Sequence, residues 1–480
     1  MHLCRHVHHL GPCSPMKSTR SDALVFFGAT GDLAFKQIFP ALQALTRLDQ
    51  LEMPIVAVGR NDLTQDQLLA RAKESVSKDG AFDAAAFAKL SKRLRYVKVA
   101  YDDATTFARI RDAIGDAKHP LHYVALPSEV FEAVATNLAS AGLHQGARLA
   151  LEKPFGHDGA SAKALSEKLH RFFPEEALFR IDHYLAKESV ENLIYFRAAN
   201  PLIEASLNRE RVESVQITMA ESFGVAGRAK FYDAVGAVRD VFQNHLLEVV
   251  ACLTMELPAN TGHMGLRAER SRLLADVRAL SAADIVCGQA RAYKSEEGVP
   301  RGSTTETFAV LRLSIDSPRW RGVPFFIRAG KYLPVTATEA TIRWKRSERA
   351  VLEEHSPPSH NYVRFRLGPA VVIALGVNVK RDGQALIGDE KELVLRRTAW
   401  HQTKPYERLL NDAIEGDPTL FPRRDAVDES WRVVDPILGK TKPFEYEPAS
   451  WGPDEAAHVQ PEGGWLLPTD DTEAERLEPL

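Results

Sequence analysis

Cysteine is scarce in this sequence: four residues occur in 480, without the regular spacing of a disulfide framework. This argues against a small secreted scaffold held by disulfides, and a reducing compartment fits the composition. Long apolar runs are also missing. Ala370–Val377 is a representative run, and it is far shorter than the roughly 18 residues that a membrane-spanning helix needs. We therefore expect a cytoplasmic protein with no membrane partner.

An excess of charge of one sign is lacking as well. The chain has 61 lysine and arginine residues against 64 aspartate and glutamate residues, for a formal net charge of −3. This balance gives no indication of a nucleic-acid partner. With 45% hydrophobic and 26% charged residues, the composition is that of a globular protein with enough apolar residues for two or three cores.

The first twenty residues have no apolar periodicity. They contain Cys4, Cys13 and four histidines, which could suggest a metal site, but no known ligand spacing is present. The apolar core of a secretion signal is absent too. We predict that residues 1–20 form a disordered tail, and Met16 remains an alternative start.

Residues 21–182 alternate between short apolar runs and helical spacing. The predicted strands are Ala23–Phe27, Pro54–Val58, Leu121–Leu126 and Arg148–Leu151, with helical segments such as Glu129–Ala141 between them. Alternation of this kind is typical of right-handed crossovers and a parallel sheet. We predict an α/β, Rossmann-like, doubly wound dinucleotide-binding domain over residues 21–182.

Residues 183–480 follow a different pattern, with strand-like stretches separated by long connections. The predicted strands are Val212–Met219, Phe308–Ile315, Val323–Ile327, Thr341–Trp344, Tyr362–Leu367, Val371–Leu375 and Glu392–Arg396. The predicted helices are Tyr184–Phe196, Val238–Leu253 and Glu269–Leu280. This order predicts an α+β domain with a large, mostly antiparallel sheet.

A glycine turn follows the first predicted strand. It reads Gly28, Ala29, Thr30, Gly31, Asp32 and Leu33, and a helix is predicted after it. The first glycine permits a tight turn, and the second lets the backbone approach a pyrophosphate. The N-terminus of the helix then offers N–H groups to the anion. A plain loop is the alternative, but the position after the first strand favours a dinucleotide site.

The second predicted strand is followed by Arg60, where an NAD enzyme usually carries a carboxylate for the ribose 2′-hydroxyl. A guanidinium suits the 2′-phosphate of NADP through paired, charge-assisted hydrogen bonds. Two alternatives remain open: Arg60 is a solvated surface residue, or Asp62 offers a carboxylate to NAD. The sequence favours NADP as the cofactor.

Several motifs resemble the glucose-6-phosphate dehydrogenase family, in order from about residue 24 to 453. They are Leu151–Gly156 (LEKPFG), Arg180–Glu188 (RIDHYLAKE), Val238–Leu247 (VRDVFQNHLL), Gly322–Lys331 (GVPFFIRAGK) and Gly416–Arg424 (GDPTLFPRR). The resemblance implies oxidation of D-glucose 6-phosphate by NADP to a lactone, the first step of the oxidative pentose phosphate pathway. It also implies a homodimer or homotetramer, assembled through the domain at 183–480 that also binds the substrate, and no metal.

The resemblance assigns the chemistry to His245 and Asp182. Imidazole suits a general base because its ordinary pKa, near 6.5, is close to working pH. A carboxylate beside it orients the ring and stabilises the imidazolium that forms. Read without the motif, His245 would more often be a structural histidine.

The sugar phosphate needs convergent donors, and the resemblance assigns them to His183, Tyr184 and Lys187. His183 and Lys187 are four residues apart, so a helix that starts here would present both on one face. An exposed basic face is the alternative reading. The resemblance further places Lys153 near substrate and nicotinamide, after a bond to Pro154 that tends to be cis. It places Glu221 and Asp240 on sugar hydroxyls, with Lys331 completing the substrate site.

The sequence departs from the family at several positions. Gln37 and Thr336 stand where many members carry a basic residue, so strictness for glucose 6-phosphate and for NADP is open. Leu367–Pro369 stands where a glutamine–proline pair is usual, so we predict that the accessory nucleotide site of some members is absent. Two rivals remain: a related dehydrogenase with another sugar or with NAD, and a non-catalytic nucleotide-binding partner of a true dehydrogenase.

Overall fold

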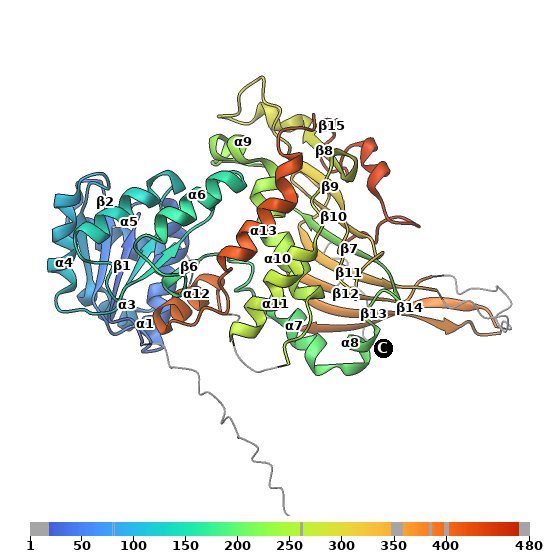
Figure 1. Cartoon of the computed structure of the whole chain (residues 1–480), viewed down its shortest axis with the longest axis horizontal. Coiled ribbons are helices and arrows are strands. Elements are labelled where there is room, and N and C mark those ends of the chain that lie inside the picture. Colours follow the sequence, from blue (N-terminus) through green and yellow to red (C-terminus); the bar gives the residue numbers. More distant parts are fainter. Residues whose placement is uncertain are drawn as a thin grey trace, which may run out of the picture.

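The structure, a computed structural model, describes residues 19–78, 80, 82–259, 263–346, 359–383, 386–397 and 403–469. The tail predicted at 1–20 lies outside these residues apart from 19 and 20, and so does Met16. The described chain contains two sheets with helices packed on them (Figure 1). Among the described residues, none of the helices is long and apolar enough to span a membrane.

The first sheet has six parallel strands in the order β3-β2-β1-β4-β5-β6. Their bounds are β1 (Ala23–Phe27), β2 (Ile55–Gly59), β3 (Leu94–Lys98), β4 (Pro120–Val124), β5 (Arg148–Leu151) and β6 (Leu178–Arg180). The strand order reverses at β1, as in a doubly wound dinucleotide-binding sheet. The predicted Rossmann-like fold is confirmed, and β3 and β6 are strands that the sequence reading did not identify.

Helices cover both faces of this sheet, because each buried strand presents alternate residues to opposite sides. Leu24 and Phe26 pack toward α1 (Phe39–Arg47), α2 (Gln65–Lys78), α3 (Ala84–Arg93) and α12 (Pro405–Glu415). Val25 and Phe27 pack on the other face, toward α4 (Ala108–Ile114), α5 (Phe131–Ser140) and α6 (Gly159–Leu169). Helix α12 comes from far along the chain, and its Leu409 and Leu410 are fully buried in this core.

The second sheet has nine strands in the order β14-β13-β12-β11-β7-β10-β9-β8-β15. Six of its eight neighbouring pairs are antiparallel; β7–β10 and β8–β15 are parallel. The bounds are β7 (Val212–Ala220), β8 (Ile285–Ala290), β9 (Phe308–Leu313), β10 (Phe325–Gly330), β11 (Ala337–Trp344), β12 (Tyr362–Gly368), β13 (Val371–Lys380), β14 (Gly388–Arg397) and β15 (Phe444–Tyr446). The mostly antiparallel sheet is therefore confirmed.

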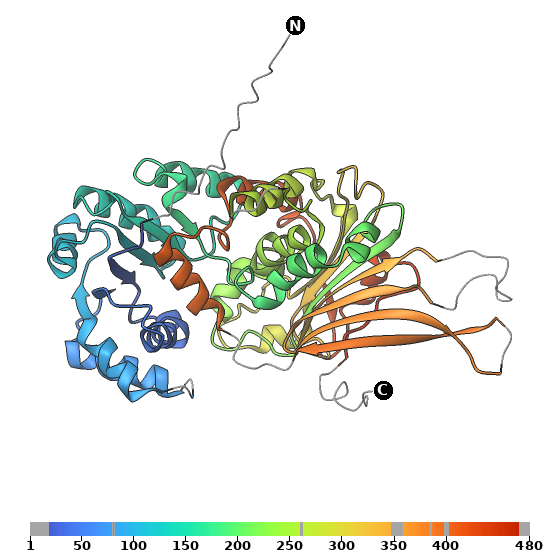
Figure 2. The same ribbon diagram turned by 90° about the horizontal axis from the view of Figure 1, so that it is seen from below.

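Helices lie on one face of the second sheet, between it and the first sheet (Figures 1 and 2). They are α7 (Glu188–Ala199), α8 (Pro201–Ser206), the π-helix η5 (Val238–Leu246), α10 (Leu247–Thr254), α11 (His263–Asp276) and α13 (Arg424–Val434). Helix α9 (Ala229–Ala237) instead packs Ala229 and Tyr232 in a cluster with Phe308 and Phe326, whose side chains lie on the other face. The predicted helix at 238–253 is thus half π-helix, and the one predicted at 269–280 begins earlier and ends earlier.

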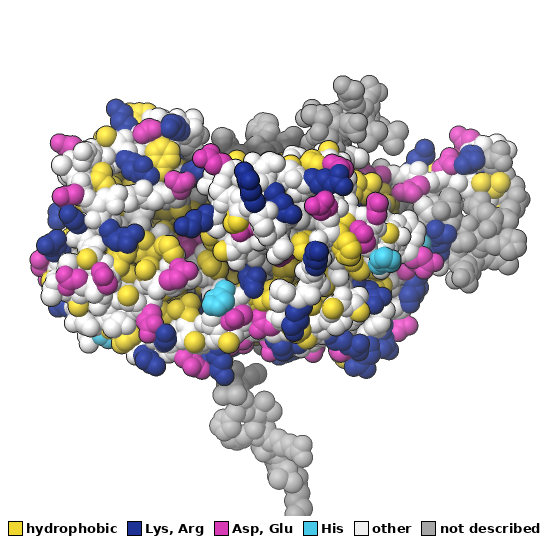
Figure 3. All heavy atoms as spheres, turned by 90° about the horizontal axis from the view of Figure 1, so that it is seen from above, with side chains coloured by type: hydrophobic (Ala, Val, Ile, Leu, Met, Phe, Trp, Pro, Cys, Tyr) yellow, Lys and Arg dark blue, Asp and Glu magenta, His cyan; other side chains and the backbone are white. Residues whose placement is uncertain are grey.

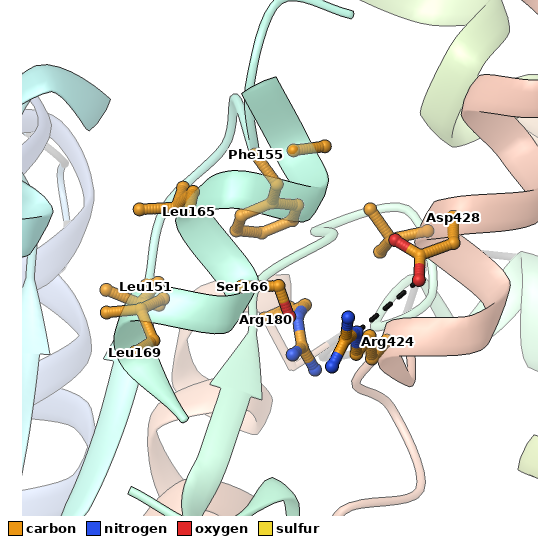
Figure 4. A pocket seen from close by; sticks show the side chains of 10 residues that line it. Leu151, Phe155, Leu165, Ser166, Leu169, Arg180, Arg424 and Asp428 are labelled. Carbon is orange, nitrogen blue, oxygen red and sulfur yellow. Dashed lines mark ion pairs between the residues drawn. The ribbon is translucent and has the colours of Figure 1, made fainter. Parts of the chain in front are cut away.

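The two halves meet where β5, β6 and α6 face α13 (Figure 4). Trp431 of α13 donates from Nε1 to the carbonyl of Phe155 at 3.1 Å. Glu175 accepts from the guanidinium of Arg180 at 2.8 Å and from the backbone N–H of Arg424 at 2.9 Å. A cavity of only about 10 Å³ remains there, room for one water. This junction anchors the segment after β5, which carries Lys153.

Candidate active site

The candidate site lies at the carboxyl ends of the first sheet's strands, opposite η5 of the second half. Ligands bind at this edge in doubly wound sheets, near the point where the strand order reverses. Asp182 follows β6, Lys153 follows β5, and the glycine turn follows β1. His245 and Asp240 come from η5.

His245 and Asp182 form a buried pair. The Nδ1 atom of His245 lies 2.5 Å from Oδ1 of Asp182, and the two residues are only 2% and 3% exposed. The same carboxylate oxygen accepts the backbone N–H of Tyr184 at 2.9 Å. Because a carboxylate only accepts, the imidazole proton lies on Nδ1 and Nε2 keeps its lone pair. This is the tautomer that a base acting through Nε2 requires.

Lys153 faces that lone pair. Its Nζ lies 2.7 Å from Nε2 of His245 and donates to the backbone carbonyl of Asp240 at 2.9 Å. The π-helix explains why Asp240 and His245 share one partner, since its i→i+5 hydrogen bonding brings residues five apart onto one side. The peptide bond between Lys153 and Pro154 is cis, as the resemblance implied.

The surroundings of the pair shift the pKa values of both residues. Burial lowers the pKa of His245, the Asp182 charge opposes this shift, and the Lys153 charge adds to it. Burial alone would raise the pKa of Asp182, but the charge that His245 carries when protonated, together with its hydrogen bond, outweighs burial and lowers that pKa. Near neutral pH, His245 is therefore uncharged and Asp182 is ionised.

The predicted helix spanning Tyr184–Phe196 is wrong at its start. Residues 183–186 form a turn, and α7 begins at Glu188 with Lys187 as its extended N-cap residue. The Asp182 carboxylate that accepts the Tyr184 N–H stabilises this turn in competition with the helix. The expectation that His183 and Lys187 share a helix face is therefore wrong.

The turn nevertheless gathers the three predicted phosphate donors beside the pair. The Tyr184 ring stacks on His245 with centroids 4.3 Å apart, and the His183 ring lies 4.5 Å from His245. Lys187 Nζ is 3.5 Å from the centre of the Tyr184 ring. Burial lowers the pKa of Lys187 to about 8 and that of His183 well below its ordinary value. Lys187 is thus the cation of this group and His183 a neutral donor.

Glu221 and Lys331 meet because they follow two paired parallel strands. Ala220 at the end of β7 is the register partner of Gly330 at the end of β10, so the next residues emerge side by side. Lys331 Nζ lies 2.5 Å from Glu221 Oε2. Thr336, at the position where the resemblance led us to expect a basic residue in many members, bonds through its hydroxyl to Ser222 at 2.8 Å. Position 336 therefore carries a neutral hydroxyl in place of a positive charge.

Two residues at this site were missed by sequence reasoning. Glu152 is buried and accepts from the hydroxyl of Tyr123 at 2.5 Å and from that of Tyr406. The ring of Tyr406, from α12, stacks near His183 with centroids 6.3 Å apart. Burial raises the pKa of Glu152 to about 7. A carboxylate ending a buried strand beside Lys153 was a usable signal, but nothing local pointed to Tyr406.

The glycine turn has the close approach expected of a dinucleotide site. Gly28 has φ +84°, and a Cβ there would lie 2.2 Å from the carbonyl oxygen of Ala125. A Cβ at Gly31 would meet only the Gly28 carbonyl within 4 Å, at 3.2 Å, so the turn is open on that side. Arg60 is exposed, with its guanidinium 5.6 Å from the centre of the Tyr101 ring. Asp62, the alternative partner for NAD, pairs with Lys98 at 3.3 Å.

The described residues contain one cluster with the makings of a metal site. Asp182, His183 and His245 each offer a ligand atom within 4.8 Å of the others. The Lys153 ammonium, 2.7 Å from His245, opposes a second cation there. The expectation that no metal takes part stays a prediction.

A doubly wound sheet with a glycine turn, facing a buried histidine–carboxylate pair, defines the class of dinucleotide-linked dehydrogenases. Within that class, the chain belongs to the glucose-6-phosphate dehydrogenase family. The family's NAD binding domain matches residues 25–192, and its C-terminal domain matches residues 194–465.

Individual relatives agree with this assignment. The chain is 38% identical over 453 residues to glucose-6-phosphate 1-dehydrogenase 1 of Mycobacterium tuberculosis, covering 93% of this chain and 97% of the relative. The crystal structure of glucose-6-phosphate 1-dehydrogenase from Mycobacterium avium is 40% identical with a TM-score of 0.88, covering 94% of this chain and 99% of the other. A glucose-6-phosphate dehydrogenase in complex with glucose 6-phosphate is 32% identical with a TM-score of 0.85, covering 94% and 100%.

Proposed function

We propose that this protein oxidises D-glucose 6-phosphate to 6-phospho-D-glucono-1,5-lactone and reduces NADP, the first step of the oxidative pentose phosphate pathway. The observation that carries the proposal is the buried pair of His245 and Asp182. The pair adjoins the turn at 183–186 and lies at the same edge of the first sheet as the glycine turn. The relative solved with glucose 6-phosphate supports the choice of substrate.

His245 removes the proton of the C1 hydroxyl through Nε2. The Lys153 ammonium now lies 2.7 Å from that atom, so it must turn aside as the hydroxyl enters. Asp182 stabilises the imidazolium that results, in the manner of a catalytic histidine–carboxylate pair. The nicotinamide ring, when bound, supplies the acceptor for the C1 hydride. Glu221, Asp240 and Lys331 orient the sugar, and Lys187 binds its phosphate with His183 and Tyr184.

NADP fits the residues of the first half. The peptides from Gly28 to Leu33 and the following helix would hold the pyrophosphate. Arg60 would pair with the 2′-phosphate, since it is exposed and makes no ion pair among the described residues. Lys153 would lie beside the nicotinamide. We assign residues 21–182 to dinucleotide binding and 183–480 to substrate binding and oligomerisation, with α12 returning to the first half.

The function is tested by following NADPH absorbance with a panel of sugar phosphates and free glucose. We expect kcat/KM to be at least about a hundredfold higher for glucose 6-phosphate than for glucose, because the phosphate gains at least two charge-assisted hydrogen bonds. Equal efficiency on both sugars would exclude the proposed substrate. A higher kcat/KM with another sugar phosphate would favour a related dehydrogenase with a different substrate. No activity with any sugar on the panel would favour a non-catalytic, nucleotide-binding partner of a true dehydrogenase.

Lys187→Ala should mainly raise the KM for glucose 6-phosphate, by about tenfold to hundredfold, because its ammonium meets the dianion in both ground and transition states. The lowered pKa, about 8, adds a pH signature. The ammonium is present below that pH and lost above it, so kcat/KM of the wild type should fall above about pH 8. This fall should be absent in Lys187→Ala. A collapse of kcat at unchanged KM would move Lys187 to the chemical step.

Arg60→Ala should lower kcat/KM with NADP by about tenfold to hundredfold, the worth of one charge-assisted hydrogen bond. Activity with NAD serves as the internal control and should hardly change, because only NADP carries the 2′-phosphate. The wild type should prefer NADP and keep measurable NAD activity. An equal loss with both cofactors would mean that Arg60 has a structural role.

We place the protein in the cytoplasm, in line with the cytoplasmic names of plant relatives. On the face shown in Figure 3, basic and acidic side chains are interspersed, which offers no single-sign surface for a nucleic acid.

We further propose a homodimer or homotetramer. The outermost strand β14 exposes Leu393 and Leu395 by 56% and 68%, and light scattering would give the mass of the assembly.

A further inference from the structure

Arg71 on α2 reaches back forty residues to the glycine turn. Its Nη2 donates to the carbonyl of Thr30 at 2.9 Å and to that of Gly31 at 3.1 Å. These two bonds hold the Thr30 and Gly31 peptides in one orientation, in the turn where the proposed function places the cofactor. The rest of the guanidinium is not used in this way: Nε is buried without a hydrogen-bond partner among the described residues. Within the part of the chain that the structure describes, Nη1 makes no hydrogen bond, and it is not among the buried unpaired atoms.

The charge of Arg71 is also unpaired within the described chain. The guanidinium lies 4.9 Å from the centre of the Phe35 ring, which stacks but does not neutralise it. Glu74, the nearest acid along α2, interacts electrostatically with Arg71, but its ion pair is with Lys78 at 2.7 Å. Asp32 of the turn pairs with Lys36 at 3.4 Å. A half-buried cation with neutral partners attracts an anion.

The position of Thr30 indicates which anion this is. Its methyl group lies 3.3 Å from the point where a side chain at Gly59 would begin. Gly59 ends β2 and precedes Arg60, and the end of this strand is where such sheets read the 2′ position of the adenine ribose. Arg71 therefore approaches from α2 the same corner that Arg60 approaches from β2.

We propose that Arg71 is a specificity-determining residue, whose guanidinium holds the Thr30–Gly31 peptides and adds a second positive charge to the 2′-phosphate site begun by Arg60. This inference rests on the proposed function, because it requires NADP in the first half. The proposal also accounts for Gln37, which is uncharged where many members of the family carry a basic residue. Helix α2 supplies the positive charge to the turn instead, and the Phe35 ring lies under Arg71 and Lys78.

The test uses two fragments of the cofactor, 2′,5′-ADP and 5′-AMP, which share the adenosine and differ in the 2′-phosphate. Their affinities are measured by calorimetry on the whole protein, for the wild type and three variants. Arg71→Gln removes the charge and most of the hydrogen bonding, whereas Arg71→Lys keeps the charge. Lys73→Gln is the control and removes an exposed cation from the same helix. The Nζ of Lys73 lies near Phe82 and not near the turn.

Arg71→Gln should weaken binding of 2′,5′-ADP by about tenfold and of 5′-AMP by less than about twofold, as expected for one partly screened charge near a phosphate. Arg71→Lys should recover part of the loss, and Lys73→Gln should match the wild type. The NADP-to-NAD ratio of kcat/KM should fall in parallel with the 2′,5′-ADP affinity. Unfolding curves verify that the variants are folded.

An equal loss for both fragments would overturn the inference, because it would limit Arg71 to shaping the turn. No loss for either fragment would overturn it too. These outcomes differ from a failure of the proposed function, in which the wild type itself would bind neither 2′,5′-ADP nor NADP and would oxidise no sugar phosphate.

Discussion

His245→Ala should lower kcat by about 10²- to 10⁴-fold, the usual contribution of a positioned general base. The wild-type Nε2 carries the lone pair that faces Lys153, and alanine removes it. The KM for glucose 6-phosphate should change far less, because the lost interaction belongs mainly to the transition state. Initial rates from NADPH absorbance, with both substrates varied, separate the two constants.

Alanine at this position also leaves the Asp182 carboxylate buried without its main partner, so a loss of folding has to be distinguished from a loss of chemistry. His245→Asn is the matched variant. Its amide nitrogen can take the place of Nδ1 and donate to Asp182, but no atom remains that can accept a proton at the Nε2 position. A folded His245→Asn protein with near-normal kcat would refute the assignment of the base.

The pH profile gives an independent view of the same residue. The kcat/KM of the free enzyme should rise as His245 loses its proton, and it should level off above the pKa of that histidine. Burial and the Lys153 charge lower this pKa, so the rise should be centred below the ordinary value of about 6.5. The rise should be missing in His245→Asn.

Local patterns in the sequence were sufficient for most of the fold. Runs such as Ala23–Phe27 and Arg148–Leu151 are strands over the predicted residues, because a buried parallel strand needs a short, continuous apolar segment. The glycine turn was readable for a similar reason, since Gly28 needs a backbone conformation that other residues rarely adopt. The short strands β6 and β15 carry little apolar pattern and were missed.

The candidate site was predicted where its residues lie in motifs, and missed where distant segments meet. His245 and Asp182 are 63 residues apart, and the resemblance named both before their 2.5 Å contact was known. No local sequence pattern pointed to Arg71 or Tyr406. The contacts of Arg71 lie about forty residues away along the chain, and those of Tyr406 lie more than two hundred residues away. The helix start at 184 was misplaced because the side chain of Asp182 bonds the backbone of its own turn, a competition that apolar periodicity does not register.

Asp182→Asn should lower kcat by on the order of 10²-fold, because it removes the charge from the charge-assisted hydrogen bond to the imidazolium. The structure indicates how. Oδ1 accepts from both His245 Nδ1 and the Tyr184 N–H, so the asparagine should keep its oxygen at that position and leave the imidazole in the same tautomer. Its amide nitrogen would then replace Oδ2, which is buried without a hydrogen-bond partner in the described chain.

What asparagine removes is therefore mainly the negative charge that stabilises the imidazolium. In the wild type this charge raises the pKa of His245 against burial and against Lys153. Without it the pKa should fall further, so the rise of kcat/KM with pH should move to lower pH while its plateau drops. A glucose 6-phosphate deuterated at C1 provides the second measurement, because slower chemistry should increase the isotope effect on kcat. A reduced kcat with an unmoved pH profile and an unchanged isotope effect would mean that Asp182 acts on folding and not on the base.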